Sequence, residues 1–128
     1  MTDASQEGAP LVLIVDDNEK NRRLTRDVLG AAGFRTLEAA SGAEGIALAA
    51  VHLPDVILMD LRLPDMDGTD AARALGEGAT SGIPVVALSS LVLGADEQLR
   101  GAGFAGYLEK PFSVRELPDQ VRGFCGAA

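Results

Sequence analysis

Charged residues stand at the ends of three apolar runs in this chain. The run LVLIV leads directly into Asp16 and Asp17, VILM leads into Asp60, and GYLE leads into Lys110 and Pro111. Parallel strands that end at the same edge of a sheet bring such residues into one crevice. Three carboxylates in one crevice repel each other unless a cation joins them, and a hard divalent ion such as Mg²⁺ (or Mn²⁺) suits an all-oxygen site. A lysine opposite the carboxylates would suit an added phosphate, so the pattern predicts phosphoryl-transfer chemistry.

The apolar runs alternate with helical patterns along the chain, which predicts repeated βα units and a parallel sheet. Strands are expected over residues 11–15, 34–39, 56–59, 83–88 and 104–108. Helices are expected over 18–32, from 41 to about 52, from 68 to 75, over 94–102, and from 113 to the end of the domain. Right-handed crossovers between five strands and five helices give an α/β fold with three layers, α/β/α.

Periodicity and helix-end signals add detail to three of these helices. Leu24, Val28, Leu29 and Ala32 share one face of the first helix, and Ile46, Ala47 and Ala50 share one face of the second, so both sets are expected to point inward. The pairs Ser41/Glu44 and Ser113/Glu116 have capping-box spacing. Pro118 either kinks the last helix or forces it to begin later.

Length and charge limit the functions that are open to the chain. Its 128 residues make one domain, with residues 1–10 expected to be a disordered lead-in and 125–128 a short tail. The formal net charge of −8 argues against nucleic-acid binding by this domain and against docking on anionic lipid. No apolar stretch is long enough to span a bilayer. The single cysteine, Cys125, cannot form an internal disulfide, which favours an incidental role and a reducing, cytoplasmic location.

Four motifs in order resemble the receiver domain of two-component response regulators. They are VDDN at 15–18, MDLRLPDMDG at 59–68, ALSS at 87–90 and YLEKPF at 107–112, and the resemblance extends from Leu11 to Phe124. It implies the flavodoxin-like, doubly wound five-stranded parallel sheet with strand order 2-1-3-4-5. We expect a single-domain regulator, and a receiver taken from a larger chain stays open as an alternative.

The resemblance also implies a role for each residue that matches the motifs. Asp60 would be the phosphoacceptor, while Asp17, Asp60 and the backbone carbonyl of Arg62 would bind Mg²⁺ directly and Asp16 mainly through a water. Ser89 and Lys110 would contact the phosphoryl group, and the Lys110–Pro111 peptide would be cis. Tyr107 matches the aromatic residue that turns inward on activation, so Ser89 and Tyr107 would form the switch.

The expected function is a phosphorylation-dependent signalling switch. A histidine kinase or a histidine phosphotransfer protein would donate the phosphoryl group to Asp60, and output would pass through contacts with a downstream protein effector. The chain would catalyse only its own Mg²⁺-dependent phosphorylation and dephosphorylation, so it is expected to be a signalling module and not an enzyme. A homodimer that forms on phosphorylation stays open as the form of output.

Three other classes of protein were weighed against this one. A flavin binder needs a hydroxyl- and glycine-rich loop after the first strand, where this chain has Asp16-Asp17-Asn18. A phosphohydrolase of the haloacid dehalogenase type needs a second Asp two residues after the nucleophile, where this chain has Arg62. A degenerate receiver that acts as an unphosphorylated scaffold is disfavoured because the set of acids is intact.

A few residues keep two interpretations. Leu91-Val92-Leu93 either packs into the core or forms an apolar patch for a partner. Ser90 adds a hydroxyl beside Ser89, and the Arg62 side chain either overhangs the site or is solvated. His52, the only histidine, is expected to be solvated at the end of its helix.

Overall fold

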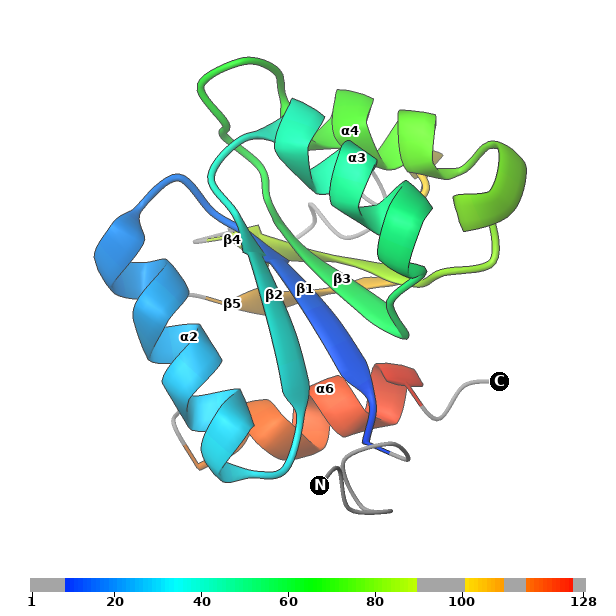
Figure 1. Ribbon diagram of the computed structural model, residues 1–128. Helices are drawn as coiled ribbons and strands as arrows, with labels where there is room; N and C mark the ends of the chain where they lie inside the picture. The colour runs from blue at the N-terminus through cyan, green and yellow to red at the C-terminus, as the bar shows by residue number, and fades with distance from the viewer. Residues whose placement is uncertain (1–8, 90–100, 110–114, 126–128) are drawn as a thin grey trace.

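The computed structural model describes residues 9–89, 101–109 and 115–125, and Figure 1 shows their arrangement. Five parallel strands form one sheet in the order β2-β1-β3-β4-β5, which confirms the predicted topology. The strands are β1 (Leu11–Val15), β2 (Arg35–Ala39), β3 (Val56–Asp60), β4 (Val85–Ser89) and β5 (Gly106–Glu109). The helices are α2 (Glu19–Ala31), α3 (Gly42–His52), α4 (Gly68–Leu75), the 3₁₀ helix η1 (Gly78–Thr80) and α6 (Leu117–Cys125).

The sheet is covered by helices on both faces, as the continuous apolar strands predicted. Figure 1 shows α3 and α4 on one face and α2 and α6 on the other. Successive residues of β1 point to opposite faces, so Leu13 and Val15 pack toward α3 and α4 while Val12 and Ile14 pack toward α2 and α6. Strands buried on both faces need this near-continuous run of apolar residues, which holds the sheet edge rigidly in place.

The two helices that follow β1 and β2, α2 and α3, have N-termini capped by side chains. Asn18 caps α2 by accepting a hydrogen bond from the Asn21 N–H at 3.0 Å. Ser41 caps α3 by accepting from the Glu44 N–H at 3.2 Å, and the Glu44 carboxylate accepts from the Ala40 N–H at 2.8 Å. The helix start predicted from the Ser41/Glu44 spacing is therefore confirmed.

The inward faces of the helices differ in part from the prediction. On α2, Leu29 is buried as expected, but Leu24 is half exposed and Thr25 lies inside, where its hydroxyl donates to the Asn21 carbonyl at 2.8 Å. On α3 the buried residues are Gly42, Gly45 and Ala49, whereas Ala47 and Ala50 are exposed. The reason is close packing: a Cβ at Gly45 would lie 2.7 Å from a Val15 methyl, so only glycine lets the helix approach the strand this closely.

The last helix begins at Leu117, four residues after the expected Ser113, so Pro118 lies in its first turn. Proline is tolerated there because the missing N–H would have no partner within the helix. Leu117 and Val121 are buried against the sheet. The Arg122 guanidinium lies over the Phe34 ring at 5.2 Å, which joins α6 to the connection between α2 and β2. Most of the helix expected over 94–102 lies outside the described residues, and so does Ser113.

Candidate functional site

Three carboxylates meet at the carboxyl edge of the central strands, as the sequence predicted. Asp16 follows the last residue of β1, and Asp60 is the last residue of β3, beside it in the sheet. Asp16, Asp17 and Asp60 each offer one carboxylate oxygen to a group whose members all lie within 4.8 Å of one another. Strand register brings them together, because Val15 pairs with Met59 and each strand then continues by one residue into its acid.

The three acids differ in their exposure to solvent. Asp16 is fully buried, Asp60 is partly buried, and Asp17 is exposed. Asp16 is fixed by its neighbours: its N–H donates to the Ala39 carbonyl at 3.1 Å, and its Oδ1 accepts from the Asn18 N–H at 2.9 Å. The cluster is therefore anchored on its inner side and open to solvent on its outer side, which lets an ion or a donor group enter.

Asp60 lies where β3 turns sharply into the following loop. Its Oδ1 accepts from the Arg62 N–H at 3.2 Å, and the Gly68 N–H donates to the Leu61 carbonyl at 2.8 Å. A short antiparallel bridge joins Arg62 to Asp67. The loop between β3 and α4 thus folds back on itself, which holds the Arg62 backbone close to the carboxylates.

The chemistry of this donor set fits a hard divalent cation. Three carboxylate oxygens within 4.8 Å of one another would repel strongly in its absence. Mg²⁺ and Mn²⁺ prefer oxygen ligands of this kind and retain several waters, which the exposed outer side of the cluster allows.

Of the residues expected to contact the phosphoryl group, Ser89 is described in its backbone. Ser89 ends β4 and pairs in register with Glu109, the last residue of β5. Lys110 follows Glu109 directly in the chain. Lys110, Pro111 and their peptide bond lie outside the described residues, as do Ser90 and the Leu91-Val92-Leu93 run.

Tyr107 and His52 are both on the surface. Tyr107 is on β5, opposite Ala87, with 41% of its surface exposed. Its ring is therefore outside the core in this structure, and the inward turn expected on activation stays a prediction. His52 is exposed at the end of α3, as expected.

Cys125 lies away from the acids, in a surface hollow of about 530 Å³ that includes Pro54, Pro84 and Phe124 in its wall. Burial, and secondarily the nearby Asp55 carboxylate, raises the pKa of the Cys125 thiol above its ordinary value. A thiol of raised pKa is mostly protonated at neutral pH and is a poor nucleophile.

Two residues beside the acids were missed by the sequence reasoning. Arg22 donates from Nη1 to the Asp16 carbonyl at 3.0 Å. Asp65 accepts from the Gly42 and Ala43 N–H groups at 2.8 and 2.9 Å, so it ties the β3–α4 loop to the start of α3. Arg22 lies four residues after the cap Asn18, on the same face of α2, which is the one local signal that could have pointed to it.

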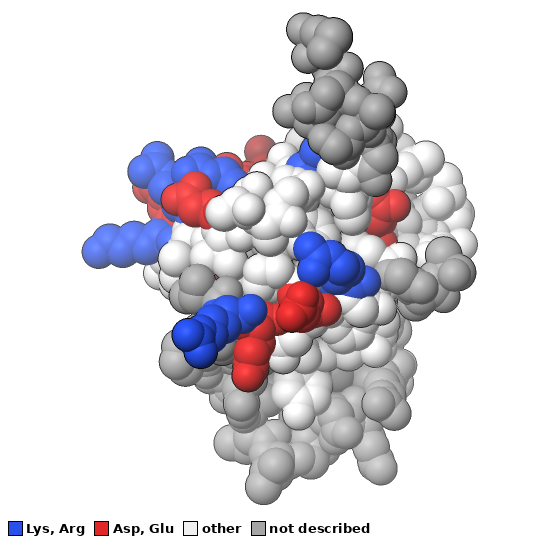
Figure 2. Space-filling view, turned by 90° about the horizontal axis from the view of Figure 1, so that it is seen from below, with Lys and Arg blue, Asp and Glu red and all other residues white. Residues whose placement is uncertain are grey.

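Charged side chains of both signs lie on the surface. Figure 2 shows basic and acidic side chains side by side on one face, within otherwise uncharged surface, and not as one continuous basic patch. Among residues 9–89, 101–109 and 115–125, no helix combines the length and the apolar character that crossing a membrane would require.

Comparison with known proteins gives one consistent family. The family model described as response regulator receiver domain matches residues 12–122. The polar-differentiation response regulator DivK of Brucella ovis is 37% identical over 119 residues, covering 91% of this chain and 97% of its own length.

Solved structures show the same similarity. The chemotaxis response regulator CheY4 of Vibrio cholerae superposes with a TM-score of 0.85 at 28% identity and covers 91% of this chain and 98% of its own. The receiver domain of the sensor histidine kinase PA1611 from Pseudomonas aeruginosa has a TM-score of 0.84 at 31% identity, over 93% of this chain and 99% of its own. That structure has a magnesium ion coordinated in its active site cleft.

Proposed function

Because the chain belongs to the response regulator receiver domain family of two-component signalling, we propose that it is a switch controlled by phosphorylation of Asp60. The observation that carries this proposal is the group of three carboxylates, Asp16, Asp17 and Asp60, whose oxygens lie within 4.8 Å of one another. Asp60 is the member at the end of the central strand β3 and is partly exposed, so it is accessible to a donor and held in a fixed direction.

The metal ligands in this proposal are Asp17, Asp60 and the Arg62 backbone carbonyl, with Asp16 acting mainly through a water. A bound Mg²⁺ or Mn²⁺ would neutralise the negative charge that develops on the oxygens of the phosphoryl group during its transfer. The similar receiver of PA1611, which has magnesium in its active site cleft, supports this assignment.

Asp60 is the nucleophile. One of its carboxylate oxygens forms a bond to phosphorus, the bond between phosphorus and the donor imidazole nitrogen breaks, and the bonding pair stays with the imidazole. The product is an acyl phosphate, which water later hydrolyses. Positioning and electrostatic stabilisation are the main contributions a protein makes to such a transfer. Ser89 and Lys110 hold the phosphoryl group at the outer side of the site.

Output follows from the change of charge at Asp60. A phosphoryl group adds negative charge and strong acceptor oxygens, which bias a two-state element nearby. Ser89 and Tyr107 form that element in this proposal, and the exposure of 41% of the Tyr107 surface supports an outward position of the ring before activation. The phosphoryl donor is a histidine kinase or a histidine phosphotransfer protein. The signal passes on to a downstream protein effector, and the chain works in the cytoplasm.

Phosphorylation with a small donor tests the proposal directly. The protein is incubated with acetyl phosphate and Mg²⁺, and intact mass is measured with and without excess EDTA. Gain of one phosphoryl group is expected only with Mg²⁺, and it should be lost in Asp60→Asn. Asp70→Asn is the matched control, because Asp70 is an exposed acid on α4 whose ion pair with Arg73 is also exposed. A wild-type protein that gains no mass, or an Asp60→Asn variant that still gains it, would overturn the proposal.

A further inference from the structure

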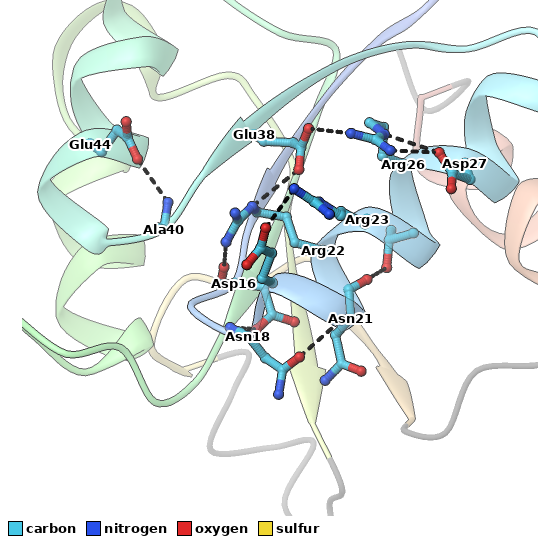
Figure 3. Close-up of polar contacts among 12 residues, drawn as sticks. Asp16, Asn18, Asn21, Arg22, Arg23, Arg26, Asp27, Glu38, Ala40 and Glu44 are labelled. Carbon is cyan, nitrogen blue, oxygen red and sulfur yellow. Dashed lines mark hydrogen bonds and ion pairs between the residues drawn. The ribbon is translucent and has the colours of Figure 1, made fainter.

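Arg22 joins the innermost acid of the site to the neighbouring strand. Its Nη1 donates to the Asp16 backbone carbonyl at 3.0 Å, and its Nε donates to Oε1 of Glu38 on β2 at 3.1 Å (Figure 3). The side chains of Arg22 and Glu38 are only 17% and 29% exposed. An ion pair this sheltered from solvent is screened less than most surface pairs.

The Asp16 carbonyl belongs to the peptide group that links Asp16 to Asp17. The orientation of this one peptide group therefore determines how two of the three carboxylates of the site lie relative to each other. On its other side, Asp16 is held by the hydrogen bond from its N–H to the Ala39 carbonyl of β2. Arg22 adds a second contact to this residue, because it donates a hydrogen bond to the Asp16 carbonyl, just after the end of β1.

We propose that Arg22 is a positioning residue for the metal site, which it serves by fixing the Asp16–Asp17 peptide and thereby the two carboxylates. This proposal rests on the function proposed above, because it concerns the same carboxylates. Groups that orient metal ligands from outside the coordination shell typically change metal affinity by about 10-fold or more when they are removed.

The direction in which metal affinity changes when Arg22 is replaced distinguishes a positioning role from a purely electrostatic one. A guanidinium near three carboxylates opposes a cation electrostatically, so loss of its charge alone would tighten metal binding. Loss of a positioning contact would weaken it. Arg26 offers the matched control, because it pairs with Oε2 of the same Glu38 at 3.3 Å and with Asp27 at 2.9 Å, so that its guanidinium is engaged away from Asp16.

The test measures Mn²⁺ binding to the unphosphorylated protein, by the loss of the free-ion signal in electron paramagnetic resonance. Arg22→Met is expected to raise the Kd for Mn²⁺ by about 10-fold, whereas Arg26→Met should leave it unchanged or lower it. The Mg²⁺ concentration that gives half-maximal labelling by acetyl phosphate should rise with Arg22→Met, while the rate at saturating Mg²⁺ stays close to wild type. Arg22→Met binding Mn²⁺ as tightly as Arg26→Met would overturn the proposal.

A second readout keeps the test independent of activity and of global stability. The Asp17 amide shares its peptide group with the Asp16 carbonyl, so its ¹H and ¹⁵N shifts in the metal-free protein should move in Arg22→Met and not in Arg26→Met. Should Arg22→Met fail to fold, Arg22→Lys replaces it: lysine keeps the charge but has one nitrogen in place of the separate Nη1 and Nε that contact the Asp16 carbonyl and Glu38, so its Kd should still exceed that of wild type. An Arg22→Lys Kd equal to wild type would count against the proposal. Wild-type protein that binds no Mn²⁺ would instead refute the proposed function itself, and the role of Arg22 with it.

Discussion

The α-carbon of Gly68 lies directly against the backbone of Asp60. A Cβ atom at position 68 would overlap the Asp60 carbonyl oxygen and would lie 2.8 Å from the Leu61 Cα. These neighbours are backbone atoms, which cannot move aside as a flexible side chain can. The tight return of the loop from Asp60 to the start of α4 therefore depends on the absence of a side chain at Gly68.

Gly68→Ala should destabilise the protein by about 1–3 kcal/mol, because added volume at a closely packed position forces the backbone to shift. The free energy of unfolding is measured with urea, and labelling of Asp60 by acetyl phosphate should slow because the shifted backbone carries the phosphoacceptor. Gly30→Ala is the control, since Gly30 lies in α2 with nothing within 4 Å of the added Cβ. That variant should stabilise by about 0.5–1 kcal/mol, and equal stabilities of Gly68→Ala and wild type would contradict the prediction.

Asp65 ties the same loop to α3. The backbone N–H of Ala43, and then that of Gly42, donates to its carboxylate, and these hydrogen bonds hold the pKa of Asp65 below its ordinary value. A carboxyl whose pKa is lower in the folded state than in the unfolded state stabilises the fold above the unfolded pKa. That contribution is lost as pH falls through the folded pKa.

Asp65→Asn should therefore lower the melting temperature at pH 7, because an amide offers one acceptor oxygen in place of two and carries no charge at the helix N-terminus. The difference from wild type should begin to shrink as pH falls below about 4, where the carboxyl of the unfolded chain takes up a proton, and should be lost once pH has fallen through the lower pKa of the folded state. Thermal melts from pH 7 to pH 3 measure it. Asp67→Asn is the comparison, since Asp67 makes no side-chain cap bond at the start of α4, and its deficit should be smaller. A deficit for Asp65→Asn that is independent of pH would show that the charge is not involved.

Leu53 ends α3 in the left-handed conformation, with φ 48° and ψ 63°. A non-glycine residue there costs about 1–2 kcal/mol, and Leu53 is half exposed, so its side chain regains little of that by burial. Leu53→Gly should raise the free energy of unfolding by about 1 kcal/mol. Leu53→Ala is the control, because it removes the same side chain but keeps the Cβ, and it should give no gain. If both variants lost stability equally, the strain would be absent.

The carboxylate cluster should make stability depend on divalent cations. At a Mg²⁺ concentration ten times its Kd, binding to the folded state should add about 1.4 kcal/mol to the free energy of unfolding. Without metal, Asp17→Asn should be more stable than wild type, because it removes like-charge repulsion among the acids. With Mg²⁺ it should gain less than wild type. Urea denaturation with Mg²⁺ and with EDTA measures both effects, and an Asp17→Asn variant that responds to Mg²⁺ like wild type would exclude Asp17 as a ligand.

The parallel sheet and the meeting of the three acids could both be predicted from the chain alone. A strand buried on both faces needs a continuous apolar run, and parallel strands must end at a common edge. The first requirement is local and the second follows from the alternation of strands and helices along the chain, so LVLIV and VILM followed by aspartates sufficed to predict that Asp16, Asp17 and Asp60 gather there.

Helix boundaries were readable only where a cap gives a local signal. Ser41 and Glu44 marked the start of α3 correctly, because their hydrogen bonds close within four residues. The Ser113/Glu116 spacing by itself predicted too early a start for the last helix, whereas the later start that Pro118 offered as an alternative is confirmed, since α6 begins at Leu117 with Pro118 in its first turn.

The polar contacts that hold the segments around the acids in place could not be predicted in this way. Arg22 reaches Glu38 across 16 positions, and Asp65 reaches Gly42 across 23, so neither contact leaves a periodic trace in the chain. Likewise, Gly45 faces inward and Ala47 outward because α3 approaches Val15 closely. This close approach depends on how α3 packs on β1, and the sequence of α3 alone does not show it. Hydrophobic periodicity encodes which face of an element is buried on average, whereas the partners of a polar side chain depend on how elements distant in the chain are placed relative to one another.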